Sequence, residues 1–394
     1  MVGPTEVFDA VVVGGGPAGA TAAETLARAG RSVLLLDRAG RIKPCGGAIP
    51  PRLIRDFAIP DRLICAQIRA ARMVAPSHRA VDMPIDGGYV GMVDREVFDE
   101  FLRDRAARAG AVRRTGVYQR IERDPAGSAE VCFRTAGGPA SVKARMVVGA
   151  DGALSQVARQ EVAPQGPRYV FAYHEVVQVP GGGGGGFDGK RCDVVYDGAI
   201  SPDFYGWVFP HGSTASIGSG SAQKGFSLKR SVADLRKATG LDGWQTLRRE
   251  GAPIPMKPLR RWDNGRDVVL AGDAAGVVAP ASGEGIYYAM VGGQLAAEAG
   301  VAFLEEGEAR ALASARRRFM KAHGRVFWIL GLMQHFWYRN DRRRERFVSI
   351  CRDRDVQTLT WQAYMNKELV RSRPAAHFRI FMKDMAHLLG LGTP

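Results

Sequence analysis

The chain has 394 residues, 46% hydrophobic and 24% charged, which is the balance of a globular protein with two or three packed units. Its five cysteines are dispersed without a C-x-x-C pair, so the composition argues against a structural metal site and a disulfide framework. The apolar run at 326–333 is far shorter than the ~18 residues of a membrane-spanning helix, and no secretory pattern is visible, so we expect a cytoplasmic protein.

The chain begins with a predicted βαβ unit: a buried strand over residues 8–13, a helix over 17–29 and a second strand over 32–36. Residues 14–19 read G-G-G-P-A-G, a G-x-G-x-x-G motif that opens the helix, and an aspartate ends the second strand. Such glycines let the backbone approach a pyrophosphate, the helix N-terminus offers N–H groups, and the carboxylate accepts hydrogen bonds from ribose hydroxyls. The predicted cofactor residues of this unit are Gly14, Gly16, Ala18, Gly19, Asp37 and Arg38.

Two later segments repeat the pattern of a buried strand followed by a turn of glycine and aspartate. The strands are predicted over 145–148 and 267–270; Asp151 follows the first, and Gly272 and Asp273 follow the second. Either turn alone is ordinary, but a carboxylate at a strand end beside a helix N-terminus suits the ribityl chain of a flavin. Because only FAD needs both a pyrophosphate fingerprint and a distant ribityl contact, the three motifs together predict FAD.

The middle of the chain has the aromatic, alternating character of an antiparallel sheet, notably over 169–179 and 192–219. Tyr205, Trp207 and Phe209 alternate, so on a strand they share one face. Such a face suits a long apolar substrate against a flavin, and the spacing fits core residues of the sheet equally well. The hexaglycine run at 181–186 follows a proline and opens no helix, so we expect a flexible hairpin or surface loop there.

From residue 292 onward the pattern is helical, and positive charge concentrates near the end. Residues 310–394 hold 18 Lys or Arg and 6 Asp or Glu, within a chain of net charge +15. No nucleic-acid-binding motif accompanies the charge, which leaves a solvated face, an anionic lipid surface or an acidic protein. Phe327, Leu330, Met333 and Trp337 recur at helical spacing; this stripe fits either a membrane interface or packing on the FAD domain.

We therefore expect an α/β fold with a Rossmann-like FAD-binding domain, an antiparallel β-sheet substrate domain and a helical C-terminal part. The FAD-binding domain is predicted to be discontinuous, over residues 1–72, 96–165 and 263–309. The substrate domain is predicted over 73–95 and 166–262, and the basic helical region over 310–394.

The three motifs resemble the FAD-dependent family that includes para-hydroxybenzoate hydroxylase, the flavin halogenases and the geranylgeranyl reductases. Three further segments are similar to the geranylgeranyl reductases: K-P-C-G-G at 43–47, Y-x-W-x-F-P at 205–210, and P-A-S-G-E-G-I at 280–286. The halogenases carry W-x-W-x-I-P and an early catalytic lysine, whereas this chain has no lysine between Lys43 and Lys143. The resemblance is therefore closest to the reductases of geranylgeranyl diphosphate and geranylgeranyl (bacterio)chlorophyll.

This resemblance implies a set of site residues beyond the fingerprint. Cys45, Tyr205 and Trp207 would be catalytic, and Tyr205, Trp207 and Phe209 would contact the substrate. Arg95, at the start of a helix, would approach the FAD diphosphate, and Val117 would offer backbone contacts to adenine. The remaining implied cofactor contacts are Cys45, Gly46, Gly47, Gly283, Gly285 and Ile286.

The implied reaction is saturation of isolated double bonds of a geranylgeranyl chain to give the phytyl chain of chlorophyll or bacteriochlorophyll, with NADPH as electron donor. The substrate would be the free diphosphate or the esterified pigment, and the basic C-terminal region would contact a membrane or a membrane-bound enzyme. Two alternatives remain open: an FAD-dependent monooxygenase of an apolar or aromatic substrate, and a non-enzymatic prenyl carrier.

Overall fold

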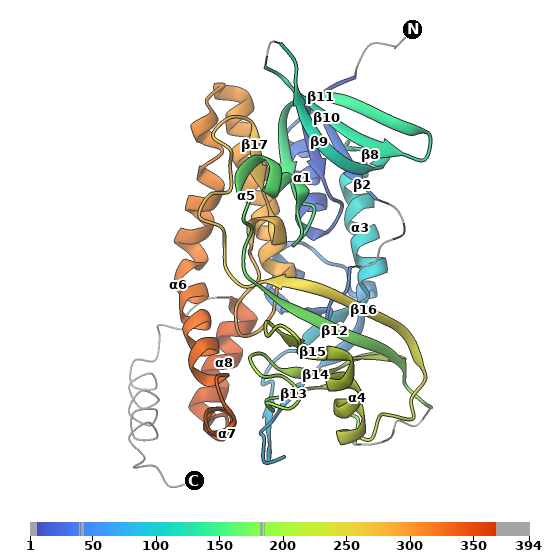
Figure 1. Cartoon of the computed structure of the whole chain (residues 1–394), viewed down its shortest axis with the longest axis vertical. Helices are drawn as coiled ribbons and strands as arrows, with labels where there is room; N and C mark the ends of the chain where they lie inside the picture. Colours follow the sequence, from blue (N-terminus) through green and yellow to red (C-terminus); the bar gives the residue numbers. More distant parts are fainter. Residues whose placement is uncertain are drawn as a thin grey trace. The chain divides into compact units, whose positions relative to one another are not determined.

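A computed structural model describes residues 6–38, 40, 43–125, 127–181, 184 and 186–367. The chain divides into two compact units, each formed from three separate segments (Figure 1). Unit 1 comprises Met1–Lys43, Arg95–Tyr169 and Pro253–Trp328, and unit 2 comprises Pro44–Asp94, Val170–Ala252 and Ile329–Pro394.

Unit 1 is built on a mixed sheet in the order β8-β2-β1-β11-β10-β9, with β17 pairing with β11. The pairs β1/β2, β1/β11, β2/β8 and β11/β17 are parallel, and β9, β10 and β11 form an antiparallel meander. The strands are β1 (Val7–Val13), β2 (Val33–Asp37), β8 (Val112–Thr115), β9 (Val117–Arg123), β10 (Ala129–Thr135), β11 (Gly138–Gly149) and β17 (Val268–Leu270).

Helices cover this sheet because its central strands are apolar along most of their length. α1 (Pro17–Arg28) begins with a proline in its first turn and packs on α3 (Arg95–Arg108) and α5 (Ile286–Glu306), the latter beside it in Figure 1. A Cβ added to Gly293 would lie 2.1 Å from the carbonyl oxygen of Ala18, so only glycine allows α5 this close to α1. Short helical turns complete the unit: η2 (Ala158–Val162), η3 (Gly272–Ala275) and η4 (Ala309–Ala311).

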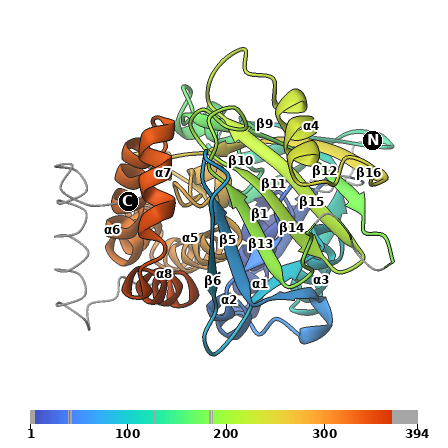
Figure 2. The same cartoon turned by 90° about the horizontal axis from the view of Figure 1, so that it is seen from below.

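Unit 2 contains a sheet in the order β16-β12-β15-β14-β13-β5-β6 and a small sheet β3-β7-β4. α4 (Leu228–Ala238) packs on β15 (Figure 2). It buries Val232 and Leu235 in an apolar core. The large sheet consists of β5 (Ala70–Val74), β6 (Ala80–Pro84), β12 (Tyr169–Gln178), β13 (Arg191–Val195), β14 (Gly206–His211), β15 (Thr214–Ser221) and β16 (Thr246–Pro255). The small sheet and its neighbours are β3 (Ala48–Ile49), α2 (Pro51–Asp56), η1 (Asp61–Leu63), β4 (Ile64–Ile68) and β7 (Val90–Val93).

The C-terminal segment forms α6 (Ser314–Trp337), α7 (Asp341–Ile350) and α8 (Arg354–Asn366). Within unit 2, the buried Arg344 donates to the carbonyl oxygens of Pro202 and Tyr338, which ties α7 to the segment before β14. Across the part of the chain that is described, no helix has the length and apolar content needed to cross a membrane. The helices α6, α7 and α8 confirm the predicted helical character up to residue 366. Residues 368–394 of the predicted region lie outside the described residues.

The unit boundaries differ most from the predicted domain boundaries in two places, and residues 95, 166–169 and 253–262, predicted in the substrate domain, also lie in unit 1. Residues 44–72, expected in the FAD domain, lie in unit 2, because β5 pairs in parallel with β13. Of the separate region expected over 310–394, the described residues 310–367 are divided between the two units, because the first part of α6 packs in unit 1, where Phe319 contacts Trp262. Both differences come from contacts between distant segments, which local patterns do not encode.

Candidate functional site

The glycine fingerprint packs closely on neighbouring backbone at Gly14 and leaves open space at Gly16. The backbone N–H of Gly14 donates to Leu36 at 2.8 Å, and Gly14 adopts a φ of +104° with a Cβ position 2.4 Å from the carbonyl oxygen of Ala150. Gly16, the N-cap of α1, has no side-chain capping bond, and a Cβ there would point into open space. That space, beside the free N–H groups at the start of α1, is a cradle that fits the FAD pyrophosphate.

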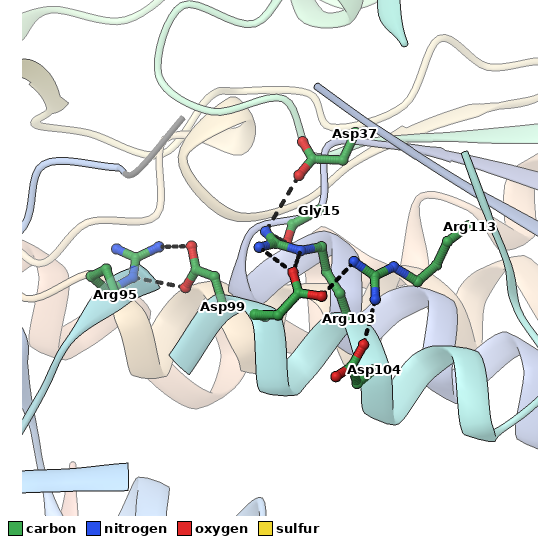
Figure 3. Close-up of polar contacts among 8 residues, drawn as sticks. Gly15, Asp37, Arg95, Asp99, Arg103, Asp104 and Arg113 are labelled. Atoms are coloured by element: carbon green, nitrogen blue, oxygen red, sulfur yellow. Dashed lines mark hydrogen bonds and ion pairs between the residues drawn. The ribbon is translucent and has the colours of Figure 1, made fainter. Parts of the chain in front are cut away.

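Asp37 ends β2 and lies at the edge of a pocket of about 400 Å³. Arg103 Nη1 lies 3.3 Å from Asp37 Oδ2 and donates to the carbonyl oxygen of Gly15 at 3.2 Å (Figure 3). Arg38 and Thr115 also line this pocket. The pocket fits the adenosine half of FAD, because a carboxylate at the end of β2 can accept hydrogen bonds from the ribose hydroxyls.

Sequence analysis missed Arg103, although a signal was present. Arg95, Asp99 and Arg103 follow one another at four-residue spacing on α3, so they share one face of the helix. Arg95 and Asp99 form a buried bidentate pair, with Nε–Oδ1 at 2.8 Å and Nη2–Oδ2 at 2.7 Å (Figure 3). This pair holds the Arg95 guanidinium in one orientation. The role of Arg95 toward the diphosphate stays a prediction.

The second motif has a structural role that the sequence did not suggest. The Asp151 carboxylate accepts hydrogen bonds from the Ser155 hydroxyl and from the backbone N–H groups of Gln156 and Val157, at 2.7 and 3.3 Å. Burial raises the pKa of Asp151, against the lowering effect of these bonds. Asp151 therefore caps the turn that follows β11, and its predicted contact with the cofactor remains untested.

The third motif meets the fingerprint directly. A Cβ added to Gly272 would lie 2.6 Å from Cβ of Ala18, so η3 lies against the start of α1. The buried Asp273 carboxylate accepts a hydrogen bond from Lys43 Nζ at 2.6 Å. Lys43 neutralises a charge at the place where a flavin would contact Asp273, and sequence analysis had assigned Lys43 no role.

The loop before α5 brings further predicted residues to the same place. A Cβ added to Gly285 would lie 3.8 Å from Asp273 Oδ1, and Ile286 is the first residue of α5. Gly283 donates its N–H to Ala279 at 3.0 Å, which closes the loop on itself. Val117 begins β9 next to Gly116, whose N–H donates to the carbonyl oxygen of Asp37. These residues lie near the fingerprint within unit 1, and their contacts with FAD remain predictions.

The predicted aromatic face is present in unit 2. Ring centroids lie 6.1 Å apart for Tyr205 and Trp207 and 6.2 Å apart for Trp207 and Phe209, so the three rings form a row along β14. Tyr205 and Trp207 are buried, and Tyr205 stacks on Phe204 with centroids 4.2 Å apart. Burial raises the pKa of the Tyr205 hydroxyl, and the neighbouring Tyr338 and Cys45 add to the effect. Tyr205 therefore keeps its proton throughout the physiological pH range.

The K-P-C-G-G segment lies directly on this row. A Cβ added to Gly46 would lie 3.0 Å from Phe209 Cδ2. Gly47 has a φ of +72°, and its Cβ would lie 2.5 Å from His211 Nε2, so glycine is required there. Cys45 Sγ accepts the N–H of Gly47 at 3.4 Å. Burial lowers the pKa of His211, a residue that sequence analysis missed, so His211 is held neutral beneath the segment.

The comparisons with known proteins agree with this geometry. An FAD binding domain family matches residues 7–177, which include the fingerprint, Asp37 and Asp151. A crystal structure of a geranylgeranyl bacteriochlorophyll reductase-like protein from Thermoplasma acidophilum superposes with a TM-score of 0.80 at 22% identity, covering 94% of this chain and 99% of that one. Fold and site together define an FAD-dependent oxidoreductase.

Two curated relatives identify the family. The chain is 58% identical to the geranylgeranyl diphosphate reductase of Rhodobacter capsulatus over 98% of its own length and 99% of the relative's. It is 36% identical to the chloroplastic geranylgeranyl diphosphate reductase of Oryza sativa over 96% of its own length and 85% of the relative's. This chain belongs to the geranylgeranyl diphosphate reductase family, and FAD is its cofactor.

Proposed function

We propose that this chain saturates isolated double bonds of a geranylgeranyl chain to give the phytyl chain of chlorophyll or bacteriochlorophyll. The observation that carries the proposal is the near full-length identity of 58% to the Rhodobacter capsulatus reductase. The structure adds support, because the K-P-C-G-G segment and the aromatic row, which lie far apart in sequence, meet within unit 2.

The chemistry requires a hydride and a proton at a double bond with no polarising carbonyl. Reduced FAD, when bound, supplies the hydride. A proton added to one alkene carbon develops positive charge on the other, and this second carbon would accept the hydride. The chain must therefore deliver the proton to the first carbon and stabilise the charge on the second. Trp207 and Phe209 offer aromatic faces for that charge, and the burial of Tyr205 and Trp207 keeps competing water out.

The proton source is proposed to be the Tyr205 hydroxyl or the Cys45 thiol. Tyr205 lies in the buried part of the aromatic row and carries a proton, although burial raises the pKa of its hydroxyl and so makes it a weaker acid. Cys45 is half-buried, within the K-P-C-G-G segment at the aromatic row. We further propose NADPH as the electron donor. The sequence has one dinucleotide fingerprint, which we assign to FAD, so NADPH would bind without a Rossmann domain of its own.

The direct test offers the purified, reduced protein geranylgeranyl diphosphate and geranylgeranyl-esterified pigment separately, and identifies the products by mass spectrometry. We expect successive gains of two hydrogens until one double bond is left, from at least one substrate. Oxygen consumption in step with product would support a monooxygenase instead. Tight binding of the unchanged prenyl chain, without turnover under either condition, would support a carrier.

We also propose that the basic C-terminal region contacts an anionic membrane surface, from which an insoluble substrate would be drawn. Phe327 does not contribute, because it packs against Tyr288 and Phe319. α6 instead exposes Trp328 and Leu332, whose exposed fractions are 70% and 54%. The exposed Lys321 and Arg325 share this face of α6, at the same helical spacing. An apolar pair flanked by basic residues suits an interfacial helix.

A further inference from the structure

Four adjacent strands of unit 2 each contribute one side chain to a hydrogen-bonded row that ends at Trp207. The strands are neighbours in the order β16-β12-β15-β14. Their contributions, in that order, are Glu250, His174, Ser216 and Trp207. Glu250 Oε2 lies 3.1 Å from His174 Nε2, and His174 Nδ1 lies 2.8 Å from Ser216 Oγ. Trp207 Nε1 lies 3.1 Å from the same hydroxyl oxygen.

The chemistry of these groups sets the direction of the two outer bonds of the row. An indole N–H can only donate, so the Ser216 oxygen accepts from Trp207. The hydrogen bond with His174 lowers the pKa of Glu250, so its carboxylate is ionised and accepts from Nε2–H. The direction of the bond between His174 Nδ1 and the Ser216 hydroxyl follows the protonation of the ring. In either case the Ser216 oxygen accepts the indole N–H, so this bond orients Trp207.

The sheet also makes room for this arrangement. Gly218 on β15 lies opposite Trp207 in one ladder and opposite His174 in the other. A Cβ on Gly218 would lie 2.2 Å from Trp207 Cζ2 and 2.6 Å from His174 Cβ, so the two side chains occupy the space that a side chain would need. His174 and Ser216 are only 4% and 2% exposed, so water does not compete for these bonds.

We propose that Glu250, His174 and Ser216 are positioning residues that hold the Trp207 indole in its working orientation. The inference rests on the proposed function, because the orientation matters only if the indole face meets a developing positive charge. Attraction between a cation and a ring depends on the cation lying over the face. A hydrogen bond accepted from the indole N–H also raises the electron density of that ring, which strengthens the attraction.

The test compares two serines of β15. Ser216→Ala removes the partner of the indole N–H. Ser219→Ala, the matched control, removes an equally buried hydroxyl on the other face of the strand, which donates to Ile200 at 2.7 Å. Both variants are studied as FAD-loaded protein labelled with 15N at the indole nitrogens; Trp207→Phe assigns the Trp207 signal among those of the six tryptophans.

We expect Ser216→Ala to shift the Trp207 indole N–H signal upfield and to lower kcat about five- to tenfold, with FAD affinity unchanged. Glu250→Gln keeps an acceptor for His174 and should retain most of the signal position. An unchanged Trp207 signal in Ser216→Ala, or an equal loss of kcat in Ser219→Ala, would overturn the proposal. If the parent protein reduces no geranylgeranyl substrate, the proposed function fails, while the indole shift still decides whether the row holds Trp207.

Discussion

The flavin site of unit 1 and the aromatic face of unit 2 are formed by different chemical groups. The flavin site consists of glycine backbone, helix N–H groups and paired charges such as Arg103 with Asp37. The aromatic face consists of packed rings. Its polar contact at Trp207 is the Ser216 hydroxyl oxygen, which accepts a hydrogen bond from the indole N–H. A pyrophosphate needs fixed donors and open space, whereas an alkene without a dipole needs shape and ring faces.

This difference implies that substitutions in the two regions should separate into two classes. Changes at the flavin site should remove the cofactor and therefore all activity. Changes at the aromatic face should leave a yellow protein that has lost its turnover. Each substitution below can show whether loss of FAD binding and loss of turnover occur separately, as expected, or together.

The largest effect is expected from Gly16→Val, which should abolish FAD binding. Gly16 has a φ of −74° and open space at its Cβ, so the valine would not disturb the fold but would fill the pyrophosphate cradle. FAD absorbance after purification and a fluorescence titration measure the result. Gly243→Val, at another glycine with open space in unit 2, is the control. Full FAD occupancy in Gly16→Val would contradict the assignment of this loop.

Trp207→Ala should reduce prenyl reduction about thirtyfold or more, because a desolvated cation–π contact contributes ~2 kcal/mol or more. FAD affinity should change less than about twofold, as measured by titration. Trp262→Ala is the matched control: Trp262 is a fully buried tryptophan of unit 1, so FAD binding and activity should fall together there. Parallel loss of both in Trp207→Ala would make Trp207 a core residue.

Substitutions in the Arg95–Asp99 pair test whether Arg95 contributes to FAD binding or only to the stability of the fold. Arg95→Met alone leaves a buried carboxylate without its partner and should destabilise the protein by about 3–5 kcal/mol in denaturant unfolding. Arg95→Met combined with Asp99→Leu should recover most of that stability. If Arg95 contacts the diphosphate, the double variant should still bind FAD about tenfold more weakly. Affinity equal to the parent protein would leave Arg95 with a purely structural role.

The smallest effect concerns the exposed face of α6. Arg325→Gln should weaken binding to anionic liposomes about fivefold at low salt, because each basic residue near such a surface contributes ~1 kcal/mol. The effect should shrink as salt rises. Lys229→Gln removes the same charge from the exposed surface of α4 and should change nothing. A parent protein that stays with the soluble fraction in flotation would exclude the membrane proposal.

Local sequence patterns were sufficient for the elements of the flavin site. The strand, glycine loop and helix over residues 7–28 form as expected, because the apolar run, the glycine spacing and the alanine-rich segment that specify them are local patterns. The row formed by Tyr205, Trp207 and Phe209 was likewise predictable from the two-residue period of a strand. By contrast, the antiparallel meander β9-β10-β11 and the pairing of β5 with β13 escaped prediction, because strand order depends on distant partners.

The class of cofactor could thus be inferred from the amino-acid pattern, since the glycines and the aspartate of a fingerprint act within one βαβ unit. The surroundings of Trp207, in contrast, depend on contacts between strands that are distant in sequence. His174 is remote in sequence from its partner Glu250, and Ser216 looks like any strand serine until β12 and β15 lie side by side. Such side chains meet because the sheet places their strands in one order and register, and a one-residue shift would turn each of them to the opposite face.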